Sequence, residues 1–105
     1  MSNALDALNS KIFAEQLHTK FKVLLAGQPP VELELFEVKE SATAPKLELF
    51  SLEFRGPHSP RLNQQIHHLE HEKLGSFELF LTAVGAEAEG LLYEAVFHRF
   101  RKPQS

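Results

Sequence analysis

Residues 76–84, SFELFLTAV, and residues 91–101, LLYEAVFHRFR, alternate between apolar and other side chains along most of their length. A period of two places successive side chains on opposite faces, which is typical of a β-strand with one buried face. The positions that predict this buried face are Phe77, Leu79, Leu81, Leu91, Tyr93, Ala95 and Phe97. Only the segment GAEAEG separates the two stretches, and we expect it to be a flexible loop between antiparallel strands.

The same period continues upstream, in residues 19–25, 31–38 and 47–55. In the last two segments the phase slips by one residue, directly after Leu35 and directly after Leu49. Such a slip moves every later side chain to the other face unless a β-bulge absorbs it. We therefore expect a bent, bulged pair of strands, as in a small barrel. Strands that are buried on both faces at one end would show the same pattern.

Residues 59–75 fit two different structures. As a helix, the segment would be capped by Ser59, would carry an apolar stripe and would end at Gly75. As a strand, only residues 65–70 would be extended, and a turn through residues 73–76 would lead into the next strand. Periodicity alone slightly favours the helix.

The first segment of the chain has the spacing of a helix. Leu5, Leu8 and Ile12 recur at helical intervals, and Asn9 or Ser10 would cap a shorter version that begins there. The second faces of the predicted strands also carry apolar side chains, at Phe80, Val96 and Phe100. Because such side chains need cover, we expect the helix to pack over them.

These patterns predict a mainly β fold, in which an N-terminal helix precedes about six antiparallel strands. We expect meander connections to curl the strands into a small barrel or a strongly bent sheet, with the helix over an end or an open seam. The expected strands are residues 19–25, 31–38, 47–55, 65–70, 76–84 and 91–101. The expected core is Phe21, Val23, Leu33, Leu35, Phe50, Leu52, Phe54, Phe77, Leu79, Leu81, Tyr93 and Phe97. We divide the chain into an N-terminal extension (1–8), a single β-barrel-like domain (9–101) and a tail (102–105).

Composition excludes several classes of protein. None of the 105 residues is cysteine, so the chain has no disulfide, thiolate zinc site or thiol nucleophile. A formal net charge of −3 argues against nucleic-acid binding through a dominant basic surface. No apolar run approaches the roughly eighteen residues of a membrane span, and the first residues lack the pattern of a signal peptide. We expect a cytoplasmic protein that binds neither nucleic acid nor membrane.

One stretch has the spacing of a catalytic motif. HHLEH at residues 67–71 matches the H-x-x-E-H pattern of inverted zinc metalloproteases. Histidines four residues apart lie about 6 Å from each other on a helix and can share a metal ion. On a strand they are separated by roughly 13 Å and cannot. We treat His67, His68, Glu70 and His71 as candidate metal ligands, with exposed or hydrogen-bonded histidines as the alternative. We expect no catalytic residue and no cofactor.

The remaining charged residues follow a structural pattern. Alternation with apolar residues, typical of a solvated sheet face, is shown by Glu32, Glu34, Glu48 and Glu53. We expect Lys20 and Lys22 to oppose the first two of these glutamates across neighbouring strands. The basic cluster at residues 98–102, HRFRK, is a solvated strand end or an interface with acidic strands. The chain contains no nucleophile elbow and no glycine-rich phosphate loop.

Three strings in the second half resemble a family of small bacterial domains that is catalogued as a domain of unknown function. They are FSLEFRGP at 50–57, LGSFELFL at 74–81 and YEAVFHR at 93–99, joined by LEH at 69–71. Phe13, Leu17 and FKV at 21–23 are similar to the opening of the family, so the resemblance covers residues 9 to 101. The family pattern has glycine at the position of His18 or Thr19 and a proline within residues 82–85, which are minor departures for the fold.

The resemblance brings no activity, cofactor or catalytic residue with it. It implies that the stretch around Leu69, Glu70 and His71 is an extended strand that leads into a hairpin. The zinc-protease match is then a coincidence of sequence.

We expect a non-catalytic interaction or structural module that forms a homo-oligomer or binds a protein partner. The resemblance implies a phage-tail-like assembly as one setting. The alternatives are a β-barrel that binds a small apolar ligand and a metal-dependent hydrolase at His67 and His71.

Overall fold

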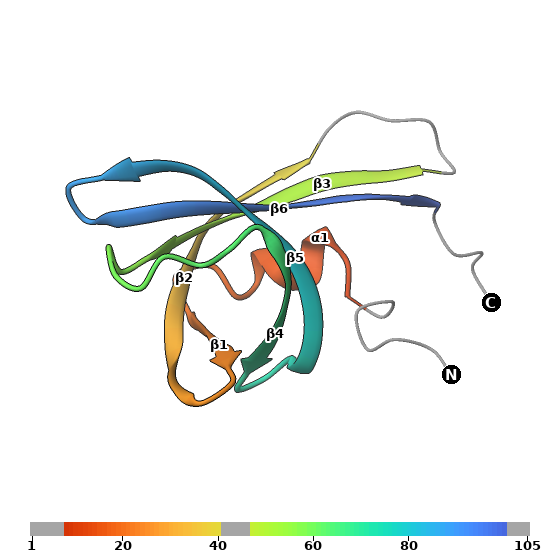
Figure 1. Ribbon diagram of the computed structural model, residues 1–105. Helices are drawn as coiled ribbons and strands as arrows, with labels where there is room; N and C mark the ends of the chain where they lie inside the picture. The colour runs from red at the N-terminus through yellow and green to blue at the C-terminus, as the bar shows by residue number, and fades with distance from the viewer. Residues whose placement is uncertain (1–7, 41–46, 101–105) are drawn as a thin grey trace.

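The computed structural model describes residues 8–40 and 47–100, which form one short helix and six antiparallel strands (Figure 1). The elements are α1 (Ser10–Ala14), β1 (Lys20–Leu25), β2 (Gln28–Glu40), β3 (Leu47–Gly56), β4 (Gln65–His71), β5 (Gly75–Glu87) and β6 (Gly90–Phe100). The predicted fold class is therefore confirmed, and the segment around residue 70 is a strand rather than a helix.

The strands form a closed barrel in the order β1-β2-β3-β6-β5-β4, in which β4 pairs back onto β1. The ring consists of two meanders, β1-β2-β3 and β4-β5-β6, which meet at the β3–β6 and β1–β4 ladders. Residues 57–64 connect the two meanders. In this connection Leu62 is buried in the core, and its backbone N–H donates a hydrogen bond to the Tyr93 hydroxyl over 3.0 Å. The connection thereby covers part of the core between β3 and β4.

Two long strands are shared between neighbouring parts of the ring. β2 pairs with β1 up to Glu34 and with β3 from Glu34 onward. β5 pairs with β4 as far as Leu81 and with β6 from Thr82 onward. The register of β2 with β3 shifts between Leu35 and Glu37, which confirms the bulge predicted there. Shared, bulged strands allow a sheet to bend sharply enough to close.

Two local predictions were wrong. The ladder between β3 and β6 runs without a register shift over the whole of Leu47–Gly56, so β3 contains no bulge. Further register shifts lie instead in β1, between Val23 and Leu25, and in β5, between Ala83 and Gly85. Most of GAEAEG also belongs to strands, because β5 extends to Glu87 and β6 begins at Gly90. Gly90 is required there, since a Cβ at this position would lie 2.0 Å from the backbone oxygen of Gly56.

The helix is the shorter of the two predicted versions. The Asn9 side chain accepts a hydrogen bond from the backbone N–H of Ile12 over 2.9 Å, which is the expected N-cap. Leu5 and the rest of residues 1–7 lie outside the described residues, as does the predicted tail at 102–105. Leu8, placed in the predicted extension, is buried in the core. In the described residues no helix is long and apolar enough to cross a membrane.

Phe13 of α1 enters the barrel as a plug. Its side chain is fully buried, and its ring centroid lies 5.7 to 6.3 Å from those of Phe50, Phe77 and Phe97. Figure 1 shows α1 beneath the long β3–β6 ribbon, between β2 and β5. The helix therefore fills the interior at one end, and aromatic pairs of this geometry contribute beyond the area that they bury.

The interior is occupied by the protein's own side chains. All the residues of the expected core are buried. The core also contains residues outside the expected core set, namely Leu8, Phe13, Val31, Leu62, Leu69 and Ala95. The prediction that α1 covers the outward apolar side chains was wrong, because the helix packs on the inward faces and leaves Phe80 and Val96 exposed.

Candidate functional site

The histidine motif lies on β4, with its members divided between the two faces of the sheet. His67 and His71 point into the barrel and are buried, whereas His68 and Glu70 point outward and are exposed. Residues four apart on a strand are separated by roughly 13 Å, which is too far to share one metal ion. Within the described residues no group of three or more histidine or acidic side chains is placed to hold a metal ion.

Both ring nitrogens of His71 are used inside the fold. Nδ1 accepts hydrogen bonds from the backbone N–H groups of Lys73 and Leu74, at 3.0 and 3.2 Å. Nε2 then carries the proton and donates it to Thr19 Oγ1 over 2.8 Å, and the Thr19 hydroxyl donates to the Gln16 carbonyl. Burial lowers the pKa of His71, which favours this neutral form. His71 holds the β4–β5 turn against the start of β1.

His67 makes a similar structural contact. Its Nε2 lies 2.7 Å from the backbone oxygen of Asn63 and donates to it, which ties the 57–64 connection to β4. The geometry therefore brings His67 and His71 to the same face without bringing them together. We assign neither residue a role in metal chemistry.

The outer surface of the barrel carries several large apolar side chains that are exposed to solvent. Ile66 of β4 and Phe80 of β5 are direct cross-strand partners, and they remain 61% and 48% exposed. Val84 and Val96 are also large apolar side chains that remain exposed. We call the Ile66–Phe80 pair the outer apolar pair. An isoleucine and a phenylalanine that are both exposed and adjacent form a small apolar patch on the surface of the barrel.

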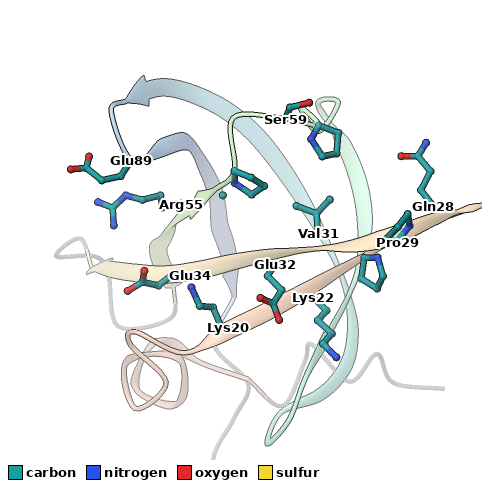
Figure 2. Close-up of a pocket in the computed structure, with 14 residues that line it drawn as sticks. Lys20, Lys22, Gln28, Pro29, Val31, Glu32, Glu34, Arg55, Ser59 and Glu89 are labelled. Atoms are coloured by element: carbon teal, nitrogen blue, oxygen red, sulfur yellow. The ribbon is translucent and has the colours of Figure 1, made fainter.

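A groove of about 1030 Å³ is lined by the β1–β2 hairpin, the end of β3, residues 57–60 and Glu89 (Figure 2). Figure 2 shows Arg55 and Glu89 at one end of the groove and Gln28 with Pro29 at the other. The predicted register is confirmed, since Lys20 opposes Glu34 and Lys22 opposes Glu32. Cations and carboxylates therefore alternate along the lining, and this mixture does not select a ligand class.

A row of carboxylates crosses the outer face of the β2-β3-β6 sheet. Glu53 of β3 lies directly opposite Glu37 of β2 and Glu94 of β6. The prediction that Glu53 is solvated was wrong, because only 8% of it is exposed. Burial, a hydrogen bond with the Glu94 side chain and the charge of Glu94 together raise the pKa of Glu53 to about 7. At neutral pH the Glu53 carboxyl is therefore protonated in a substantial fraction of the molecules, unlike an ordinary glutamate.

Glu48, another of the four glutamates predicted to lie on a solvated sheet face, forms an ion pair. Arg99 Nε lies 2.9 Å from Glu48 Oε1, and the Arg99 guanidinium also donates to the Leu8 carbonyl. The same guanidinium lies 5.2 Å from the centre of the Phe97 ring. Arg99, from the basic cluster at 98–102, thus fastens the segment before α1 to an acidic strand, as one of the two predicted alternatives stated.

A family model described as a domain of unknown function, DUF6916, matches residues 8–97. The chain belongs to this family. The DUF6916 match spans α1, five complete strands and most of β6, so the family unit coincides with the closed barrel and its helical plug. No curated protein and no solved structure matches the chain. The family description confirms the resemblance and names no activity.

Proposed function

We propose that this DUF6916 domain is a non-catalytic module that contacts another protein, or a second copy of itself, through the outer apolar pair. The observation that carries the proposal is the exposure of Ile66 and Phe80, which face each other across the β4–β5 ladder. Covering these two apolar side chains with another surface removes them from water and lowers the free energy of the system.

The interior supports the same proposal by arguing against the small-ligand alternative. Phe13, Phe50 and Phe97 fill one end of the barrel, and the Phe50 and Phe97 rings stack with centroids 4.4 Å apart. Phe21 fills the neighbouring region, with its ring 5.3 Å from that of Phe54. A ligand in these regions would have to displace well-packed aromatic side chains. A phage-tail-like assembly is one setting that we propose for the module, on the basis of the family resemblance.

Native mass spectrometry of the untagged protein, isolated from the cells that produce it, tests the proposal. We expect the wild-type protein to carry a discrete additional mass, either a further copy or a protein partner. The Ile66→Lys/Phe80→Lys double variant should lose that mass, because two ammonium groups would be buried at the contact. Gln28→Lys is the matched control, since it adds a positive charge at an exposed position on β2. A wild-type protein that is a bare monomer, or a double variant that keeps the additional mass, would overturn the proposal.

A further inference from the structure

The carboxylate row on the outer face has an arrangement that costs stability. Glu37, Glu53 and Glu94 lie directly opposite one another on three adjacent strands. Like charges in register across a sheet repel each other, and natural strand pairs usually alternate the sign. The Lys20–Glu34 and Lys22–Glu32 pairs of the same barrel follow that usual pattern.

The middle carboxylate of the row lacks a partner for one of its oxygens. Glu53 is more than nine-tenths buried, and its Oε2 atom accepts no hydrogen bond from residues 8–40 or 47–100. A buried carboxylate oxygen without a donor is expensive, since it has lost its water and gained nothing in return. A proton on the carboxyl group can satisfy this atom, and a donor from another molecule can reach it only when the side chains that cover it move aside.

The charged groups around Glu53 do not supply that donor. On β3, Arg55 faces the same side but directs its guanidinium to Glu87, 3.1 Å away, and over the Phe36 ring. On β2, the Lys39 charge favours ionised Glu53 and the Glu37 carboxylate stands opposite it. On β6, Glu94 adds a second carboxylate. Lys39 and the Ser51 hydroxyl lower the pKa of Glu53, but less than burial and Glu94 raise it.

The surface beside this pair suits a long side chain with a flat cationic end. Val96 follows Glu94 by two residues on the same outward face of β6 and is 62% exposed, so it offers apolar contact to an aliphatic stem. A guanidinium is planar, weakly hydrated and carries several donors, which matches two adjacent carboxylates better than an ammonium does.

We propose that the Glu53–Glu94 pair binds an arginine side chain of the partner protein, whose guanidinium donates hydrogen bonds to both carboxylates. In molecules in which Glu53 is protonated, that proton passes to solvent on binding, so at most one proton is released for each arginine that binds. This inference rests on the proposed function, because it assigns a charged anchor to the same interaction module. It implies that the contact strengthens as the pH rises through neutrality.

A titration of the Glu53 and Glu94 side-chain carboxyl carbons by NMR tests the inference without the partner. The probe is methylguanidinium chloride, and tetramethylammonium chloride at equal ionic strength is the control for charge without donors. We expect methylguanidinium to move the titration midpoint of the pair about one pH unit lower, and tetramethylammonium to leave it in place. Glu94→Gln should abolish the difference between the two salts, whereas Glu32→Gln, on the lysine-paired part of β2, should preserve it.

Two outcomes would overturn the arginine site. The first is an equal effect of both salts, which would show screening alone. The second is a Glu53 carboxyl that titrates near its ordinary value, because a guanidinium would then displace no proton from it at neutral pH. Neither outcome bears on the outer apolar pair, so failure of this inference and failure of the proposed function are separate results.

Discussion

At the residue scale, His71 and Glu53 are buried titratable side chains whose pKa values move in opposite directions. His71 has its Nδ1 occupied by two backbone N–H groups and its Nε2 by Thr19, so the fold stabilises the neutral ring. Glu53 faces Glu94 across the β3–β6 ladder, so the fold stabilises the protonated carboxyl. Each side chain therefore makes stability depend on pH, with opposite sign.

His71→Ala should lower the free energy of unfolding at pH 7.5 by about 2 kcal/mol, because it leaves two backbone N–H groups and Thr19 without their partner. The pKa of His71 is lowered in the folded state, so the His71 contribution is complete above the unfolded pKa of 6.5 and is lost as the pH falls through the folded pKa. Urea unfolding at several pH values should show that the difference in free energy of unfolding between wild type and variant becomes smaller as the pH falls. His68→Ala, exposed on the same strand, is the control and should change little. A gap that stays constant or widens with acid would contradict a neutral His71.

Glu53→Gln should behave in the opposite way. Because the folded pKa of Glu53 is raised to about 7 from 4.5, its contribution is complete below pH 4.5 and is lost as the pH rises through 7. The variant, which cannot ionise, should therefore be more stable than wild type at pH 8.5, by up to about 3 kcal/mol. The advantage should vanish near pH 4.5. Thermal unfolding across this range measures it, and Glu32→Gln should show no such dependence. Equal stability of Glu53→Gln and wild type at pH 8.5 would refute the raised pKa of Glu53.

At the element scale, the sequence pattern predicts the strands well because alternation is a local property. The ends of β3 and β6 are predicted to within one residue, whereas periodicity favours a helix over residues 59–75 and only the family resemblance implies β4. The position of α1 could not be predicted in this way. Its row of apolar side chains is short, and both faces of the predicted strands carry apolar side chains on which it could pack. The choice of the inner face follows from Phe13, which meets three other phenylalanines there.

Phe13→Ala tests this packing. Removing a fully buried ring from a filled core should lower the free energy of unfolding by about 3–5 kcal/mol, since the transferred surface is lost and a cavity remains. Val96→Ala, on the exposed side of β6, should cost less than about 0.5 kcal/mol. Guanidinium unfolding of both variants measures the difference. If the two substitutions cost the same, α1 does not plug the barrel.

At the scale of the whole molecule, the surroundings of Glu53 depend on which strands, distant in the sequence, pair with each other. Glu53 and Glu32 look alike in the sequence, since each alternates with apolar residues. They differ because β3 pairs with β6, which places Glu94 beside Glu53, whereas β2 pairs with β1, which places Lys22 beside Glu32. The predicted core was right because alternation fixes which side of each strand is buried. The candidate site was missed because it depends on which strands become neighbours.

The outer apolar pair also arises at this scale. Ile66 and Phe80 face each other only because β4 and β5 form a hairpin whose inner face is already filled. The barrel therefore presents to solvent a surface that its own helix cannot reach. The central claim is that another protein surface covers this pair.

Site-specific photo-crosslinking in the producing cells tests this claim most directly. p-Benzoylphenylalanine placed at position 80 or 66 should give one discrete adduct on irradiation, because a covered side chain lies in contact with one partner. The same group at position 28 or 32, on exposed β2 residues, should give none. Equal labelling at all four positions, or no adduct at 66 and 80, would contradict the account.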